Sequence, residues 1–123
     1  MDLAFQSDGK TRFPTKHHGE VTLSKKKWEL ICCEPERFYY KFNADKISTT
    51  LINPDSIRYH KVIPDQVIYY KRFEKFYVSD KSEGPLPCKF WSVVIDTTTQ
   101  RICTMYPTPK PKPGKEYQPE GRP

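Results

Sequence analysis

The chain has 123 residues and a mass of 14.5 kDa, which is the size of one domain and excludes an enzyme built from two stacked domains. Aromatic residues make up 14% of the sequence and supply bulky groups for a core, so we do not expect wholesale disorder despite a mean hydropathy of −0.79. No apolar stretch approaches the roughly 20 residues that a membrane-spanning helix needs, and the N-terminus has no secretory pattern. We therefore expect a cytoplasmic protein with no membrane contact.

The charge balance is basic, with 21 Lys and Arg against 15 Asp and Glu and a pI near 9.1. Residues 107–123 hold four cations and two carboxylates, so most of the excess lies in the rest of the chain. A basic balance favours polyanionic partners such as RNA, although ordinary solubilising charge gives the same balance.

The four cysteines, Cys32, Cys33, Cys88 and Cys103, form no C-x-x-C pair and have no histidine at a metal-ligand spacing. Cys88 and Cys103 flank a predicted hairpin turn, which leaves a disulfide open, but a cytosolic chain favours reduced thiols. We expect no metal and no cofactor.

Residues 1–19 contain two glycines, a proline and no apolar periodicity, which predicts a flexible leader before a single domain over residues 20–106. A short helix follows, capped by Ser24, with Trp28, Ile31 and Cys32 on its buried face and Pro35 beyond its end. A second helix is predicted over residues 43–52, with Asn43 as its cap and Asn53-Pro54 as its stop.

The chain then changes to a strand pattern, rich in β-branched and aromatic residues. The predicted strands are Ser56–Ile63, Gln66–Val78, Lys89–Thr97 and Arg101–Tyr106. The predicted fold is α+β, with two N-terminal helices packed on one face of a four-stranded antiparallel sheet and the other face open to a ligand. Residues 107–123 hold half of the 12 prolines and predict a disordered tail.

Strand alternation gathers polar and aromatic side chains on the open face of the predicted sheet. The candidates are Arg58, His60, Tyr70 and Arg72. Cations and phenols suit phosphate and base recognition, and an imidazole can exchange the protons that metal-free RNA cleavage requires. A one-residue change of register would bring Lys71 to this face in place of Arg72. The triple lysine Lys25, Lys26 and Lys27 is a further candidate for RNA binding, with a solvated helix face as the alternative.

Several short motifs carry a family resemblance: Trp28-Glu29-Leu30-Ile31, Glu34-Pro35-Glu36, Leu51–Ile57, Val93–Asp96 and Ile102–Thr108. In this order they resemble small bacterial and phage proteins of the barnase-EndoU-colicin-RelE-like nuclease superfamily, over about residues 21–108. The resemblance implies two N-terminal helices on a four-stranded antiparallel sheet and metal-independent RNA cleavage, often by toxins, with Thr104 and Tyr106 in the closing motif.

The chain departs from that family where similar sequences carry histidines in the first helix. Leu30 stands at the first histidine position and Glu34 at the second. Three alternatives remain: His60 or Glu34 supplies the acid–base group, a cysteine such as Cys33 does so, or the chain is a catalytically silent relative.

The sequence therefore predicts an RNA-binding domain, with metal-independent endoribonuclease activity as the further hypothesis. The predicted catalytic residues are Arg72, His60, Thr104, Tyr106 and Glu34, and the predicted RNA-binding residues are Arg58, Lys71, Tyr70, Lys25, Lys26 and Lys27. The alternative is a protein-interaction module of a phage or mobile element, whose partner is a cognate antitoxin or another protein.

Overall fold

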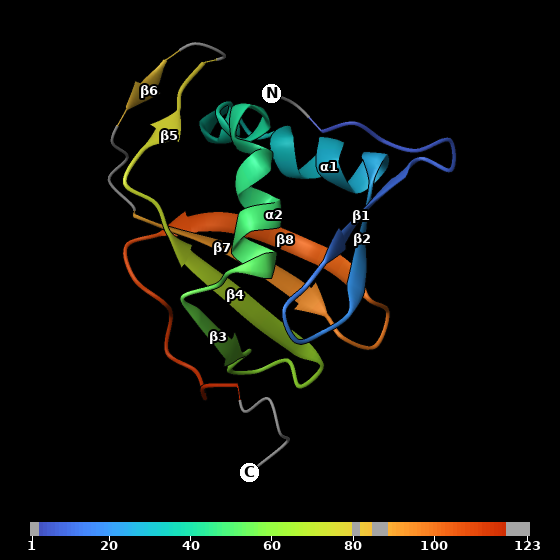
Figure 1. The fold of residues 1–123 in the computed structure, drawn as a ribbon, viewed down its shortest axis with the longest axis vertical. Helices are drawn as coiled ribbons and strands as arrows, with labels where there is room; N and C mark the ends of the chain where they lie inside the picture. The colour runs from blue at the N-terminus through green and yellow to red at the C-terminus, as the bar shows by residue number, and fades with distance from the viewer. Residues whose placement is uncertain (1–2, 80–81, 85–88, 118–123) are drawn as a thin grey trace.

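A computed structural model describes residues 3–79, 82–84 and 89–117. Its centre is a six-stranded sheet in the order β1-β2-β8-β7-β4-β3 (Figure 1). The strands are β1 (Lys10–Pro14), β2 (Glu20–Ser24), β3 (Ser56–Tyr59), β4 (Gln66–Arg72), β7 (Phe90–Asp96) and β8 (Arg101–Thr108). Neighbouring strands are antiparallel except β2 and β8, which are parallel. A separate small hairpin joins β5 (Phe76–Tyr77) to β6 (Glu83–Gly84).

The α+β class is confirmed, but the prediction of two N-terminal helices on a four-stranded antiparallel sheet is wrong. A hairpin of β1 and β2 precedes the first helix and adds two strands to the sheet. In β2, Val21 and Leu23 are buried while Thr22 between them is partly exposed, which is a strand period and not a helix lead-in. Thr22 then pairs with Arg101 at the start of β8, making the sheet mixed.

Two α-helices follow, α1 (Lys25–Cys32) and α2 (Asp45–Ile52), linked by short 3₁₀ turns at Pro35–Arg37 and Tyr40–Asn43. The predicted cap of α1 is confirmed, because the Lys27 amide donates to the Ser24 hydroxyl at 3.0 Å.

The predicted cap of α2 is wrong, since the helix begins at Asp45 after Ala44. Asn43 is fully buried and bonds elsewhere: its amide group donates to the carbonyls of Tyr39 and Tyr77 and accepts the Tyr77 amide, each at 2.7 Å. Asn43 therefore ties β5 to the turn before α2.

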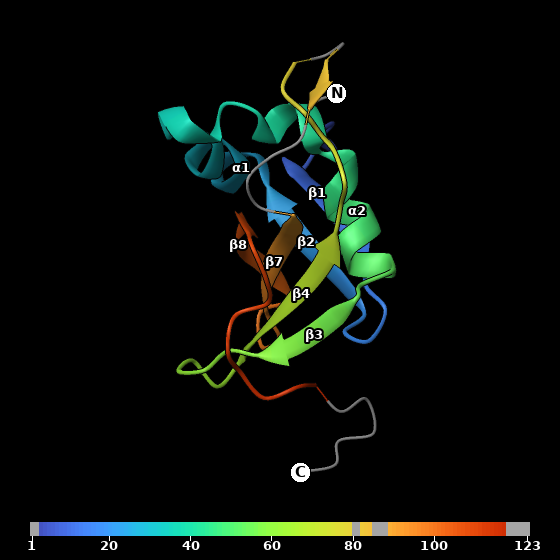
Figure 2. The ribbon, with the colours of Figure 1, turned by 90° about the vertical axis from the view of Figure 1, so that its left-hand side faces the viewer.

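The main core lies between α2 and one face of the sheet, and Trp28 and Ile31 of α1 are part of it. Figure 2 shows α2 on one side of the sheet, while α1 lies near the upper end on the other side. The buried side chains of this core alternate along the central strands: Val67 and Tyr69 on β4, and Trp91, Val93 and Ile95 on β7. We call the opposite side of β3, β4, β7 and β8 the outer face. Among the described residues, no helix is both long enough and apolar enough to span a bilayer.

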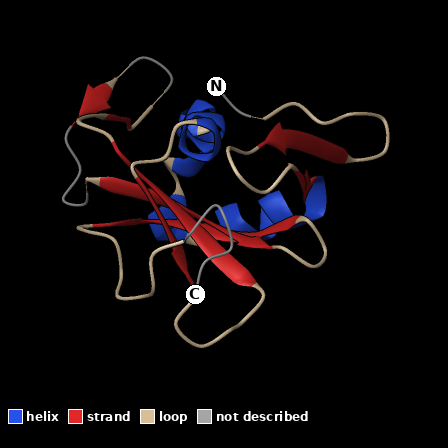
Figure 3. Cartoon of the chain, turned by 60° about the horizontal axis from the view of Figure 1, so that its bottom comes forward, coloured by secondary structure: helices blue, strands red, loops and turns tan. Residues whose placement is uncertain are grey.

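The predicted disordered tail is also wrong for the part that the structure describes. β8 continues to Thr108, and the chain then returns along β3 (Figures 1 and 2), as a loop and not as a strand (Figure 3). There the Tyr59 amide donates to the Lys115 carbonyl and the Tyr117 amide to the Ile57 carbonyl, both at 2.8 Å. As an edge strand, β3 exposes backbone groups that need partners, and this segment supplies them without regular strand structure. Likewise β1 lies within the expected flexible leader, where pairing with β2 orders it.

Candidate nucleic-acid interface

The outer face is organised in rows of side chains that run across the strands. Strand pairing aligns Ser56, Tyr70, Ser92 and Tyr106 in one row, and Arg58, Ile68, Val94 and Thr104 in the next. Ile68, Tyr70 and Val94 form a small apolar cluster, against which Phe90, Cys103 and Tyr106 pack. Successive rows are about 7 Å apart, because side chains on one face recur every second residue.

Tyr70 and Tyr106 form the aromatic part of this face. Tyr70 is fully buried, and Tyr106 is half-buried beside it. Burial raises the pKa of Tyr70 to about 12, with a smaller contribution from Tyr106. The Tyr70 phenol therefore stays neutral near pH 7 and takes part only as a hydrogen-bonding group.

Arg58 brings a guanidinium group to the same face. Its Nε lies 3.4 Å from the Ser56 hydroxyl, and its Nη1 donates to the Lys112 carbonyl at 3.1 Å. The guanidinium is thus oriented by neutral acceptors, which leaves its charge unneutralised.

Two more cations border the face. Arg101 is exposed and lies opposite Asp96 in the strand register, in the row beyond Arg58, without an ion pair between the two side chains. Burial raises the pKa of the Cys103 thiol, and the nearby Asp96 carboxylate raises it further. The charge of Lys27, on the first turn of α1, lowers it, which places Lys27 near this part of the face. In the part of the chain that the structure describes, ion pairs engage the cations of Arg12, Lys71, Arg72 and Lys89. Lys27, Arg58 and Arg101 have no carboxylate partner among those residues.

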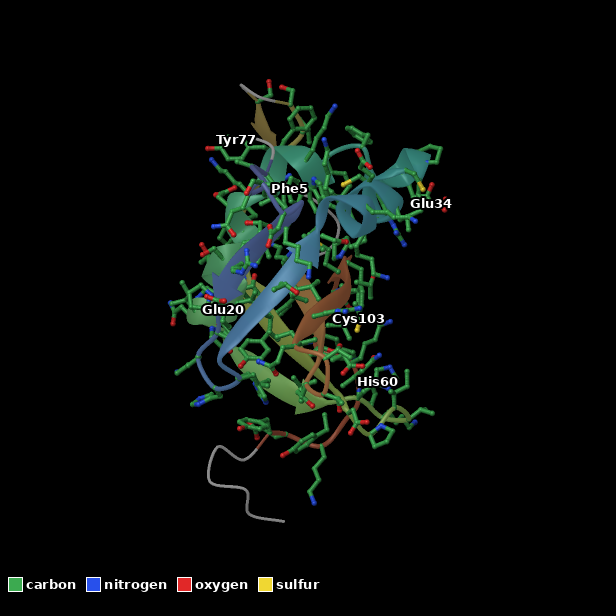
Figure 4. All side chains as sticks on the ribbon, turned by 90° about the vertical axis from the view of Figure 1, so that its right-hand side faces the viewer. Phe5, Glu20, Glu34, His60, Tyr77 and Cys103 are labelled. Atoms are coloured by element: carbon green, nitrogen blue, oxygen red, sulfur yellow. The ribbon has the colours of Figure 1, made fainter. Side chains whose placement is uncertain are left out.

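The predicted catalytic residues are not brought to one point. The His60 amide bonds the Gln66 carbonyl at the start of β4, whereas Arg72 lies at the far end of that strand, about 20 Å away at roughly 3.3 Å per residue. Arg72 is also paired with Glu74 at 3.2 Å. Figure 4 places Glu34 near the upper end of the molecule and His60 near the lower end, with Cys103 between them.

His60 has a local structural task. Its Nδ1 accepts the backbone amides of Val62 and Ile63 at 3.1 and 3.0 Å. The lone pair of this nitrogen is therefore occupied by two backbone amides. His60 therefore stabilises the turn between β3 and β4.

The remaining predicted RNA-binding residues divide between the two sides of the sheet. Lys71 pairs with Trp91 on the core face and bonds Asp55 at 3.4 Å, so it lies away from Tyr70 and Arg72. Lys25 and Lys26 are exposed in the first turn of α1. Thr104 is half-buried in the row of Arg58, as alternation along β8 requires.

A cluster of histidine and tyrosine was missed from the sequence. His17 and His18 fall in the expected leader, but the hairpin of β1 and β2 places the His18 Nδ1 2.6 Å from the buried Tyr69 hydroxyl. The Tyr117 ring lies 4.6 Å from the His18 ring, centroid to centroid. Burial lowers the pKa of His18, and His17 lowers it further. No sequence signal could have found this cluster, because its histidines are 51 or more positions from its tyrosines.

Beside this cluster is an open pocket of about 370 Å³. Its lining is mixed in charge and includes Lys16, His17, Asp55, Ser56, Glu116 and Tyr117. Asp55 is already bonded, to the Lys71 ammonium and the Arg72 amide. No group of three or more potential metal ligands occurs among the described residues. The cluster therefore fastens the turn between β1 and β2 to β4 and to the C-terminal segment.

Compared with protein-family models, with curated proteins and with solved structures, the chain matches none of them.

Proposed function

We propose that this protein binds single-stranded RNA on the outer face of its sheet. The observation that carries the proposal is that Lys27, Arg58 and Arg101, which form no ion pair among the described residues, border the same face as the half-buried Tyr106 ring. Cations attract the phosphate backbone, and an accessible aromatic ring stacks on an unpaired base. Bases in a duplex are already stacked, so the arrangement favours single strands.

The proposal is for binding without cleavage. Metal-independent cleavage needs a proton acceptor and a proton donor within reach of the same phosphate. His60 uses its Nδ1 in a turn, and Glu34 lies at the other end of the molecule (Figure 4). Cys33 is exposed beyond the end of α1, and its thiol donates to the Leu30 carbonyl at 3.0 Å.

The test is fluorescence anisotropy with a labelled single-stranded RNA of mixed sequence, with the matching duplex as competitor, in the presence of a chelator. We expect Tyr106→Ala to weaken binding by about 5- to 150-fold, because stacking contributes about 1–3 kcal/mol per base. Tyr106→Phe keeps the ring and is the matched control, with binding within about twofold of the wild type. Equal affinity for the Ala and Phe variants would contradict stacking on this ring.

The same samples run on a denaturing gel test for cleavage. Intact RNA is the expected result. Cleavage that persists in chelator and is lost in His60→Ala or Glu34→Gln would refute the proposal of binding alone.

Protein binding is the second candidate, and exposed apolar side chains favour it. Phe38 is 57% exposed and lines an open pocket of about 420 Å³ with Arg37, Lys41 and Phe42. Exposed apolar surface of this kind is typical of protein contacts. This candidate would be favoured if the wild type does not bind RNA but retains a protein partner that the Phe38→Ser variant loses.

A further inference from the structure

The C-terminal segment of residues 109–117, which we call the strap, lies on the proposed RNA site. The Lys112 amide donates to the Tyr70 hydroxyl at 3.2 Å, and the Lys112 carbonyl accepts from Arg58. The Lys112 ammonium lies 4.4 Å from the centre of the Tyr106 ring. One residue of the strap therefore engages three residues of the outer face.

The strap is held at its other end by β3. Tyr59 and Tyr117 donate the two backbone bonds described above, and Arg58 and Glu116 form an isolated β-bridge. Gly114 allows a close approach, because a Cβ there would lie 2.6 Å from the Tyr59 carbonyl oxygen. The Tyr117 ring rests against His18 and Tyr59.

These contacts are few, and apart from the bond to the buried Tyr70 hydroxyl they lie near the surface. The three lysines of the strap, Lys110, Lys112 and Lys115, are all exposed. A segment fastened by a handful of hydrogen bonds near the surface opens at lower free energy than the core. The strap can therefore leave the sheet while the domain stays folded.

We propose that the strap is a displaceable cover that competes with RNA for Arg58, Tyr70 and Tyr106. This inference rests on the RNA-binding function proposed above. The groups that would meet phosphate and base are the same groups that the strap engages. The Lys112 carbonyl oxygen bonds the Arg58 guanidinium, and the Lys112 ammonium group lies over the Tyr106 ring. RNA binds tightly only to the molecules in which the strap is open.

A strap that contributes to the RNA site would change RNA affinity in the opposite direction when it is lost. If its lysines added to the RNA site, losing the strap would weaken binding, since each phosphate contact contributes to affinity. If it covers the site, losing it strengthens binding even though positive charge is removed.

The first variant is Gly114→Ala in the full chain, which changes no charge and drives a methyl group into the Tyr59 carbonyl. We expect the amides of Tyr59 and Tyr117 to exchange with solvent faster and RNA affinity to rise. A cover closed in nine molecules of ten lowers apparent affinity about tenfold, so a gain of up to about tenfold is expected. Pro109→Ala, at an exposed position of the strap, is the control and should leave both measurements unchanged.

The second test compares two truncations. A chain ending at Thr108 lacks the strap, whereas a chain ending at Tyr117 keeps it and loses one Glu and one Arg from the residues beyond. We expect tighter RNA binding by the first and wild-type binding by the second, with circular dichroism confirming that both are folded.

The outcomes separate the two proposals. Faster exchange at Tyr59 and Tyr117 with unchanged or weaker RNA binding would overturn the cover and leave RNA binding standing, and so would weaker binding by the chain ending at Thr108. Failure of every variant and of the wild type to bind RNA would overturn both proposals.

Discussion

The dependence of RNA binding on salt gives a quantitative test of the outer face. Three cations, Lys27, Arg58 and Arg101, face the proposed site without carboxylate partners among the described residues. For single strands the slope of log affinity against log salt is about −0.7 for each neutralised phosphate, so three contacts predict a slope of about −2. Raising salt from about 50 to about 200 mM should then weaken binding about 20-fold.

Arg101→Ala removes one of these contacts from an exposed position that makes no ion pair among the described residues. The slope should fall to about −1.4, and the same change of salt should then weaken binding only about sevenfold. The control is Lys16→Ala, an exposed cation whose backbone amide bonds the Leu51 carbonyl of α2 and which lies away from the outer face. It should keep the wild-type slope.

Fluorescence anisotropy at four or more salt concentrations measures both slopes. A wild-type slope near zero would refute electrostatic binding altogether. Equal reductions in Arg101→Ala and Lys16→Ala would show that overall charge, and not the outer face, determines affinity.

Three further predictions concern stability and reactivity. Asn43→Ala should lower the free energy of unfolding by about 2–4 kcal/mol, because it removes three hydrogen bonds of a fully buried side chain and leaves the part-buried amide and carbonyl of Tyr77 without those partners. A loss below about 1 kcal/mol in urea titration would contradict this role. Burial lowers the pKa of His18 in the folded chain below its ordinary value of 6.5, so below that pH the unfolded chain binds a proton more readily than the folded chain. The stability that is present above pH 6.5 is therefore lost as the pH falls through the pKa of the folded state. Urea titrations at neutral and mildly acidic pH should show a smaller loss in His18→Gln, and an equal loss would count against this residue. Iodoacetamide should label exposed Cys33 faster than Cys103, whose pKa is raised by burial. Peptide mass mapping at early times measures both rates, and equal rates would contradict the burial of Cys103.

Local patterns predicted those parts of the fold whose signals lie close together in the sequence. Ser24 and the spacing of Trp28 and Ile31 mark the start and the buried face of α1. Runs of β-branched and aromatic residues located β3, β4, β7 and β8, although the strand predicted to reach Val78 ends at Arg72. The chain then passes Phe73 on its way to the separate strand β5.

The parts that sequence reasoning missed depend on distant partners. β1 is a five-residue strand ordered by pairing with β2, and β2 joins the sheet through Arg101, 79 positions from Thr22. The strap is similar, because its prolines argue against a regular strand but do not prevent it from covering the edge of β3. Neither outcome is encoded in the composition of the segment itself.

The candidate site illustrates the same limit at the level of side chains. Alternation along a strand determines which face a residue occupies, and it correctly separated Tyr70 and Arg72 from Lys71. It does not determine which residues share a row, since rows depend on register between strands. Register puts Tyr70 in line with Tyr106 and leaves Arg72 in the row of Phe90, beside the acid that neutralises it. Alternation therefore predicts a common face, whereas a common point, such as His60 and Arg72 would need, depends on register and strand length, and the structure places these two at opposite ends of β4.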